Sequence, residues 1–176
     1  MLFNKDKDNV LLAAQSIKLL LLDVDGVLTD GKIYFTNSGD EFKSFSTLDG
    51  HGIKMAMQAG IDVGIITGRK SDIVAKRAAD LGIKILVQGR EDKARALDEI
   101  LTDYPRSFAD ICFVGDDFPD LQVMKKIGLS FSVANGHDDV KSEADAITQK
   151  LGGAGAVREV TDYLLKAQDK YDQFLN

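Results

Sequence analysis

Aspartates that could bind a metal ion or act as nucleophiles occur in two closely spaced groups of this sequence. The first group is Asp23 and Asp25, and the second is Asp116, Asp117 and Asp120. Carboxylates that gather at one place repel each other and take up protons unless a cation compensates them. A hard ion such as Mg²⁺ does so, using carboxylate oxygens together with substrate phosphate. If the fold brings the two groups together, we therefore expect a magnesium-dependent site.

A hydroxyl group and two cations also follow apolar runs. Thr67-Gly68-Arg69 comes directly after the run 63–66, and Lys93 opens a helical pattern shortly after the run 85–87. A carboxylate that attacks a phosphate dianion meets a repulsion of about 4 kcal/mol per pair of unit charges at 4 Å and an effective dielectric near 20. Mg²⁺ and a lysine would cancel that repulsion. These residue types favour phosphoryl transfer to an aspartate, with a second carboxylate as acid and base.

The elements that must position these residues are short apolar runs alternating with helical patterns. The predicted strands are residues 19–22, 63–66, 85–87, 111–114 and 129–133, and the predicted helices include 71–82, 97–104 and 157–165. Ser71 is expected to cap the first of these helices and Gly82 to end it. Runs that are apolar throughout are typical of strands covered on both faces. The alternation predicts an α/β fold, a doubly wound parallel sheet whose carboxyl ends gather the polar residues.

One segment departs from this alternation. Residues 32–46 contain two short strand patterns around a turn-rich centre, and they predict a β-hairpin that projects from the first strand–helix connection. A hairpin alone in solvent would expose its aromatic residues, Tyr34, Phe35, Phe42 and Phe45. Because an isolated hairpin is only marginally stable in water, this apolar surface favours burial against other subunits.

The order of the polar groups resembles the four motifs of the haloacid dehalogenase phosphatases. The resemblance implies that Asp23 is the nucleophile and Asp25 the general acid and base. It also implies that Thr67 holds a phosphoryl oxygen and that Lys93 is the lysine of the third motif. Mg²⁺ would be bound by Asp23, the backbone carbonyl of Asp25, and Asp116. The residues expected to bind substrate are Gly26, Thr29, Gly68 and Arg69.

Two interpretations remain open for Asp117 and Asp120. They could support the metal site, or they could serve the following helix as its N-cap and as a first-turn acid. His51 and His137 lie in predicted loops and have no partner at metal-ligand spacing, so neither is expected to bind a metal.

Within this superfamily the chain resembles the small sugar-acid phosphatases, in particular those acting on 3-deoxy-D-manno-octulosonate 8-phosphate. The shared segments are 23–31, the hairpin, 49–54, 67–69 and 152–159. No cap domain is inserted after the first motif or between the second and third. The resemblance implies a homotetramer whose hairpins form a central barrel while a neighbour covers each site, and a product used in lipopolysaccharide biosynthesis. Arg69 suits an anionic sugar acid and favours the eight-carbon substrate over the alternative, 2-keto-3-deoxynononate 9-phosphate.

Two other classes of protein share some of these residue types. A receiver domain also phosphorylates an aspartate beside a threonine and a lysine, but its acidic pair follows the first strand, whereas Asp116 and Asp117 come late here. A non-catalytic homologue serving only in assembly would not be expected to keep Asp23, Asp25, Lys93 and Asp116 intact.

Composition sets the remaining limits. The 176 residues suit a single domain, 1–176, and 44% hydrophobic with 28% charged residues is typical of a globular protein. The net charge of -6 and the lack of a basic cluster argue against nucleic acid or an anionic membrane as partner. No apolar stretch is long enough to cross a bilayer. A lone cysteine, Cys112, lies within an apolar run and suits core packing in a reducing compartment, so a cytoplasmic location is expected.

Overall fold

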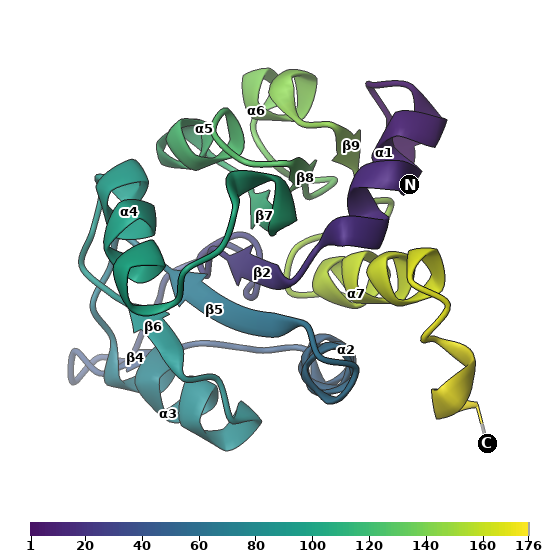
Figure 1. Cartoon of the computed structure of the whole chain (residues 1–176). Coiled ribbons are helices and arrows are strands. Elements are labelled where there is room, and N and C mark those ends of the chain that lie inside the picture. The colour runs from purple at the N-terminus through teal and green to yellow at the C-terminus, as the bar shows by residue number, and fades with distance from the viewer. Residues whose placement is uncertain (176) are drawn as a thin grey trace.

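The computed structural model describes residues 1–175, and within them it contains one mostly parallel sheet of seven strands (Figure 1). The strand order across the sheet is β1-β9-β8-β7-β2-β5-β6. In chain order the strands are β1 (Leu2–Phe3), β2 (Leu19–Leu22), β5 (Asp62–Ile66), β6 (Ile85–Val87), β7 (Ile111–Gly115), β8 (Leu129–Ser132) and β9 (Ala146–Ile147). All neighbouring strands are parallel except the edge pair β1 and β9.

Helices cover both faces of this sheet. They are α1 (Lys7–Ser16), α2 (Thr47–Gln58), α3 (Asp72–Leu81), α4 (Lys93–Asp103), α5 (Phe118–Met124), α6 (Asp138–Glu143) and α7 (Ala156–Ala167). Short 3₁₀ turns lie at η1 (Phe108–Asp110) and η2 (Asp172–Phe174). Strand β2 shows how the core is divided. Leu20 and Leu22 pack with residues of α1, α2, α3 and α7, whereas Leu19 and Leu21 pack with residues of α4, α5 and α6.

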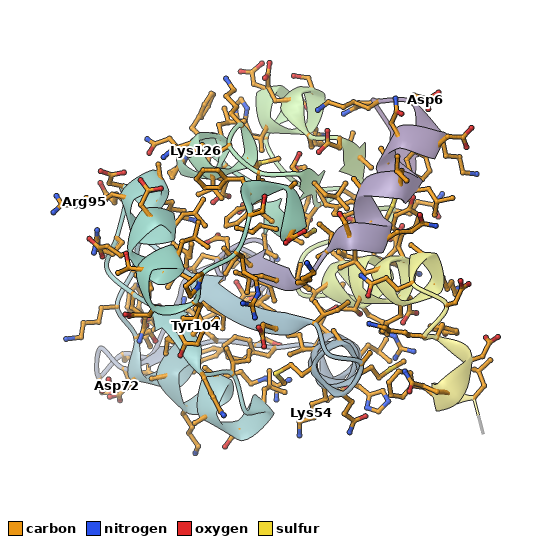
Figure 2. All side chains as sticks on the ribbon, in the orientation of Figure 1. Asp6, Lys54, Asp72, Arg95, Tyr104 and Lys126 are labelled. Carbon is orange, nitrogen blue, oxygen red and sulfur yellow. The ribbon has the colours of Figure 1, made fainter. Side chains whose placement is uncertain are left out.

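Burial on both faces explains why the central strands are apolar throughout. The four leucines of β2 are at most 1% exposed. Removing one such side chain typically costs about 2–5 kcal/mol, so the strand is a rigid support for the residues that follow it. Charged side chains such as Lys54, Arg95 and Lys126 point away from the core (Figure 2). The predicted doubly wound sheet is therefore confirmed.

The element boundaries agree closely with the apolar pattern. Strands β2 and β6 coincide with the predicted runs, and β5, β7 and β8 differ by one residue at one end. Helix α3 ends at Gly82, which has φ of +82°. The predicted capping bond from Ser71 is wrong: its side chain makes no such bond, and its backbone N–H donates to Gln88 Oε1 at 2.9 Å. The pattern did not predict β1, β9, α1 or α6. The two strands have only two residues each and α6 only six, and α1 buries only Val10 and Ala14, so none of them carries a strong apolar pattern.

The hairpin is formed by β3 (Tyr34–Phe35) and β4 (Glu41–Phe42), which pair antiparallel. Phe35 is 64% exposed and Phe42 51% exposed, as the sequence predicts. The Tyr34 ring stacks on Phe42 with 4.9 Å between centroids. The expectation is wrong for Tyr34 and Phe45, which are both half-buried. Phe45 packs against the core because the chain returns there to start α2. No helix within residues 1–175 is long and apolar enough to cross a membrane.

Candidate active site

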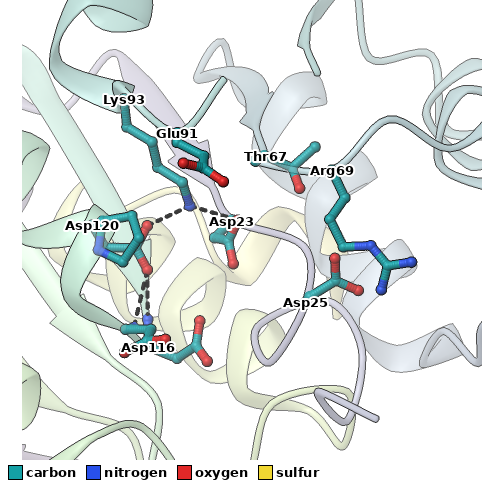
Figure 3. Close-up of a pocket in the computed structure, with 11 residues that line it drawn as sticks. Asp23, Asp25, Thr67, Arg69, Glu91, Lys93, Asp116 and Asp120 are labelled. Carbon is teal, nitrogen blue, oxygen red and sulfur yellow. Dashed lines mark hydrogen bonds and ion pairs between the residues drawn. The ribbon is translucent and has the colours of Figure 1, made fainter. Parts of the chain in front are cut away.

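A cavity of about 280 Å³ opens at the carboxyl ends of the central strands (Figure 3). Its lining residues come from the loops after β2, β5, β6 and β7 and from the first turns of α4 and α5: Asp23, Asp25, Thr67, Gly68, Arg69, Glu91, Lys93, Asp116, Asp117, Pro119 and Asp120. The fold therefore brings together nine of the residues singled out from the sequence. Gly26 and Thr29 are not part of the lining.

Lys93 links the two groups of aspartates. It is the first residue of α4. The side chain of Asp92 caps the N-terminus of this helix by accepting a hydrogen bond from the Arg95 N–H. The Lys93 Nζ atom donates to Asp23 Oδ1 at 2.7 Å and to Asp120 Oδ1 at 2.5 Å (Figure 3). Lys93 is 4% exposed and Asp23 6% exposed, so these ion pairs are almost fully shielded from water.

This shielding sets the charges of the cluster. Burial raises the pKa of Asp23 to about 6, although the Lys93 ammonium opposes the shift. Burial alone would lower the pKa of Lys93, but the carboxylates of Asp23 and Asp120 outweigh burial and raise the Lys93 pKa. Lys93 is therefore held as an ammonium ion beside the Asp23 oxygen, where it can face an incoming phosphate.

Three carboxylates form a group with the geometry of a cation site. One oxygen each of Asp23, Asp116 and Asp120 lie within 4.8 Å of one another. Burial, and next the charge of Asp23, raise the pKa of Asp116 to about 8. The buried Asp116 Oδ1 atom has no hydrogen-bond partner among residues 1–175. An unpartnered buried oxygen beside two further carboxylates is a donor set that fits Mg²⁺.

Asp120 is less available than the other two carboxylates. Its Oδ1 accepts from Lys93, and its Oδ2 accepts from the backbone N–H groups of Asp116 at 2.8 Å and Asp117 at 3.2 Å. With Asp117 at the N-cap, Asp120 completes a capping box that starts α5. The helix role considered for Asp120 is therefore seen, and the same carboxylate also holds Lys93, whereas its support of a metal ion stays a prediction. Asp117 caps the same helix through the Phe118 N–H while also lining the cavity.

The loop after β2 is shaped for close approach to Asp116. Gly26 has φ of +103°, and a Cβ atom there would lie 2.0 Å from Asp116 Oδ2, so only glycine fits. Thr29 is 1% exposed, and its hydroxyl accepts from the N–H groups of Gly26 and Gly31 at 3.3 Å each. Thr29 therefore stabilises the loop. Direct contact of Gly26 or Thr29 with substrate stays a prediction.

The late glycine-rich segment and the Asp49 segment are explained by packing. A Cβ atom on Gly152 would lie 1.6 Å from Gly26 O, so this segment presses directly on the loop after β2. Asp49 is buried in α2 and accepts from the N–H groups of Arg158 at 2.7 Å and Gly155 at 3.3 Å. It thereby fixes the start of α7 against α2. The loop expected at His51 is wrong, because His51 lies within α2, where its side chain is exposed and takes no part in the carboxylate group.

Three residues at or next to the cavity were not predicted from the sequence. Glu91 lines it directly. Lys43, from the segment after β4, forms an ion pair with Asp25, and Glu41 accepts from Arg69 Nη2 at 2.8 Å. The signal that could have revealed Glu41 and Lys43 is the alternation of side chains in the predicted hairpin strand, where residues 41 and 43 point to the same side.

Comparison with known proteins identifies relatives of this chain. Residues 86–159 match the haloacid dehalogenase-like hydrolase family. The chain is 47% identical over 165 residues to the 3-deoxy-D-manno-octulosonate 8-phosphate phosphatase of Escherichia coli K12, covering 94% of this chain and 88% of that protein. The chain belongs to this phosphatase family.

Solved structures agree with this assignment. The 3-deoxy-D-manno-octulosonate 8-phosphate phosphatase of Moraxella catarrhalis, in complex with magnesium ion, phosphate ion and the sugar acid KDO, superposes with a TM-score of 0.94 at 40% identity. That superposition covers 97% of this chain and 98% of the other. The cobalt-bound Haemophilus influenzae phosphatase gives a TM-score of 0.89 at 39% identity, covering 93% and 96% of the two chains. The family expected from the motifs is therefore confirmed.

Proposed function

We propose that this chain hydrolyses 3-deoxy-D-manno-octulosonate 8-phosphate to the sugar acid and inorganic phosphate, with Asp23 as the nucleophile. The observation that carries the proposal is the buried Asp23–Lys93–Asp120 ion-pair cluster, which lines the cavity together with Asp116. An ammonium that touches the nucleophile and a carboxylate group that fits Mg²⁺ are the two features needed for a carboxylate to approach a phosphate dianion.

The reaction runs in two steps on the chain's own residues. An Asp23 oxygen attacks phosphorus while the bond to the sugar oxygen breaks, and Asp25 gives its proton to that oxygen. Water then attacks the aspartyl-phosphate, Asp25 takes a proton from it, and the bond between Asp23 and phosphorus breaks. Thr67 and Lys93 hold phosphoryl oxygens in both steps. Asp23, Asp116 and the backbone carbonyl of Asp25 would hold Mg²⁺, which would neutralise negative charge on the phosphoryl group.

Arg69 is the residue proposed to recognise the sugar acid. Its Nη2 atom is bonded to Glu41, whereas its buried Nη1 atom finds no hydrogen-bond partner in the described part of the chain. An unpaired guanidinium donor at a cavity wall suits the carboxylate of the substrate. This favours the eight-carbon acid phosphate for which the Escherichia coli relative, 47% identical over 165 residues, is named, and the nine-carbon alternative is not favoured.

We further propose that the chain assembles as a homotetramer through the hairpin and acts in the cytoplasm. The support for assembly is the exposure of Ile33, Phe35 and Phe42 on one small two-stranded ribbon, together with a cavity without a cap domain. The support for the location is the substrate class and the buried free thiol of Cys112.

Turnover of the eight- and nine-carbon acid phosphates, measured side by side as released phosphate, tests the proposed function. We expect kcat/KM to be at least about tenfold higher for the eight-carbon substrate, a difference of about 1.4 kcal/mol. We also expect Arg69→Ala to lose more activity on this substrate than on p-nitrophenyl phosphate, which has no carboxylate. Equal or reversed preference in the wild-type enzyme would overturn the substrate assignment.

A further inference from the structure

Lys43 is a buried cation that the proposed reaction does not use. Its side chain is 1% exposed although it belongs to the hairpin segment, most of which is open to solvent. Its Nζ atom forms an ion pair with Asp25 Oδ1 and lies 3.4 Å from Glu41 Oε1. Burying an ammonium is costly unless carboxylates compensate it, so these two partners define where Lys43 must lie.

The two contacts belong to a longer chain of alternating charges. Asp25 pairs with Lys43, Lys43 with Glu41, and Glu41 with Arg69 at 2.8 Å. The end members, Asp25 and Arg69, lie next to each other in the cavity wall and come from the loops after β2 and β5 (Figure 3). The inner members, Glu41 and Lys43, come from the hairpin. The second hairpin strand and the residue that follows it therefore bridge two loops of the same chain's active site.

Lys43 is not placed to touch the substrate. It is absent from the lining of the cavity, and its side chain has almost no exposed surface. Its contact with Asp25 uses the Oδ1 atom, and within residues 1–175 this is the one hydrogen bond that the Asp25 side chain makes. The Oδ2 atom is thereby left for proton exchange, and the carboxylate is held in one orientation.

We infer that Lys43 is a positioning residue that orients Asp25 for proton transfer, so that the hairpin completes the active site of its own chain. This inference rests on the proposed function and deepens it. An acid–base group contributes roughly 10²- to 10⁴-fold to such reactions, and a displacement of about 1 Å can cost about 10²-fold. Removing the Lys43 ammonium should therefore slow the steps in which Asp25 moves a proton, and leave other steps intact.

With p-nitrophenyl phosphate as the substrate, the two steps of the reaction differ in how much they need proton transfer by Asp25. Its leaving group, p-nitrophenolate, departs without a proton, so formation of the aspartyl-phosphate needs little from Asp25. Hydrolysis of the aspartyl-phosphate still requires Asp25 to take a proton from water. A positioning defect should slow the second step alone, whereas a general structural defect would slow both.

The experiment is stopped-flow measurement of p-nitrophenolate release in saturating Mg²⁺, comparing the wild type with Lys43→Met. For the variant we expect a burst of about one p-nitrophenolate per active site, kcat lowered at least tenfold, and kcat/KM changed by less than about threefold, because kcat/KM reports the first step. With the sugar-acid phosphate, whose leaving alkoxide needs a proton, kcat and kcat/KM should both fall. Lys32, an exposed lysine of the hairpin segment, provides the matched control, and Lys32→Met should behave as the wild type.

Two further variants separate positioning from folding. Asp25→Asn combined with Lys43→Met should be no slower than Asp25→Asn alone if Lys43 acts through Asp25. Lys43→Gln keeps a buried hydrogen-bond donor and replaces Lys43→Met in the experiment if that variant does not fold. It should also lower kcat without lowering kcat/KM on p-nitrophenyl phosphate, but by a smaller factor. Parallel losses of kcat and kcat/KM on p-nitrophenyl phosphate in the folded variants, or no loss at all, would overturn the inference. If the wild type itself forms no phosphoenzyme, the proposed function fails instead.

Discussion

Replacing Lys93 by methionine should destabilise the metal-free protein and abolish turnover. It should also increase the rise in Tm that Mg²⁺ produces. Methionine keeps the length of the buried stem but removes the ammonium between Asp23 and Asp120. At 2.7 Å and 2.5 Å, each gross attraction is about 6–7 kcal/mol for an effective dielectric of 20. Burial of the charged groups offsets most of this, but removing one partner of a buried pair still costs about 3–5 kcal/mol.

This cost is large enough to measure by melting. For a protein of 176 residues, each 1 kcal/mol shifts Tm by about 2–4 °C, so the expected drop is about 6–20 °C. Mg²⁺ should recover more of the Tm in Lys93→Met than in the wild type, because the dication then faces the same carboxylates without a competing ammonium. Activity should not recover, since the phosphate dianion loses its counter-charge; we expect kcat to fall at least about 10²-fold.

Calorimetry with and without Mg²⁺, alongside phosphate release, provides the assay. Lys126→Met is the matched control, because Lys126 pairs with Asp98 on the surface and its loss should leave both Tm and kcat unchanged. If Lys93→Met melted like the wild type in chelator, or kept more than a tenth of its kcat, the role assigned to this ammonium would be wrong.

Three further predictions follow from the same site and from the hairpin. Asp23→Asn should abolish turnover while the circular dichroism spectrum stays unchanged, because an amide does not attack phosphorus; more than trace activity would contradict a covalent intermediate. Excess chelator followed by dialysis should remove activity, and Mg²⁺ should restore it, because the carboxylates of Asp23 and Asp116 then regain a counter-charge; full turnover in chelator would exclude the metal role. Phe35→Asp should yield species smaller than a tetramer by light scattering, since it places a charge on the apolar ribbon. These species should hydrolyse the sugar-acid phosphate poorly but retain p-nitrophenyl phosphatase activity, and a fully active monomer on the sugar substrate would refute the role of assembly.

Much of the fold could be predicted from the sequence because local patterns carry it. The central strands are buried on both faces, so their apolar runs mark them almost to the residue, and Gly82 ends α3 because only a residue tolerant of positive φ suits that position. Elements stabilised by distant contacts escaped prediction. Strand β1 forms because Leu2 and Phe3 pair with Ile147 and Ala146, far along the chain. Phe45 reads as a hairpin aromatic but packs on the core, since the turn into α2 carries it there.

The sequence by itself determined which residues gather: the order of Asp23, Asp25, Thr67, Lys93 and Asp116 after successive strands is enough to bring them together, because parallel strands end at one edge of a sheet. Distances and pairings needed the tertiary structure. Only the fold shows that Lys93 contacts two carboxylates at once, and that Lys43 reaches Asp25 from the hairpin. The physical reason is that strand order along the chain fixes which loops meet, whereas which charged atoms touch depends on side-chain packing between segments that no local pattern relates.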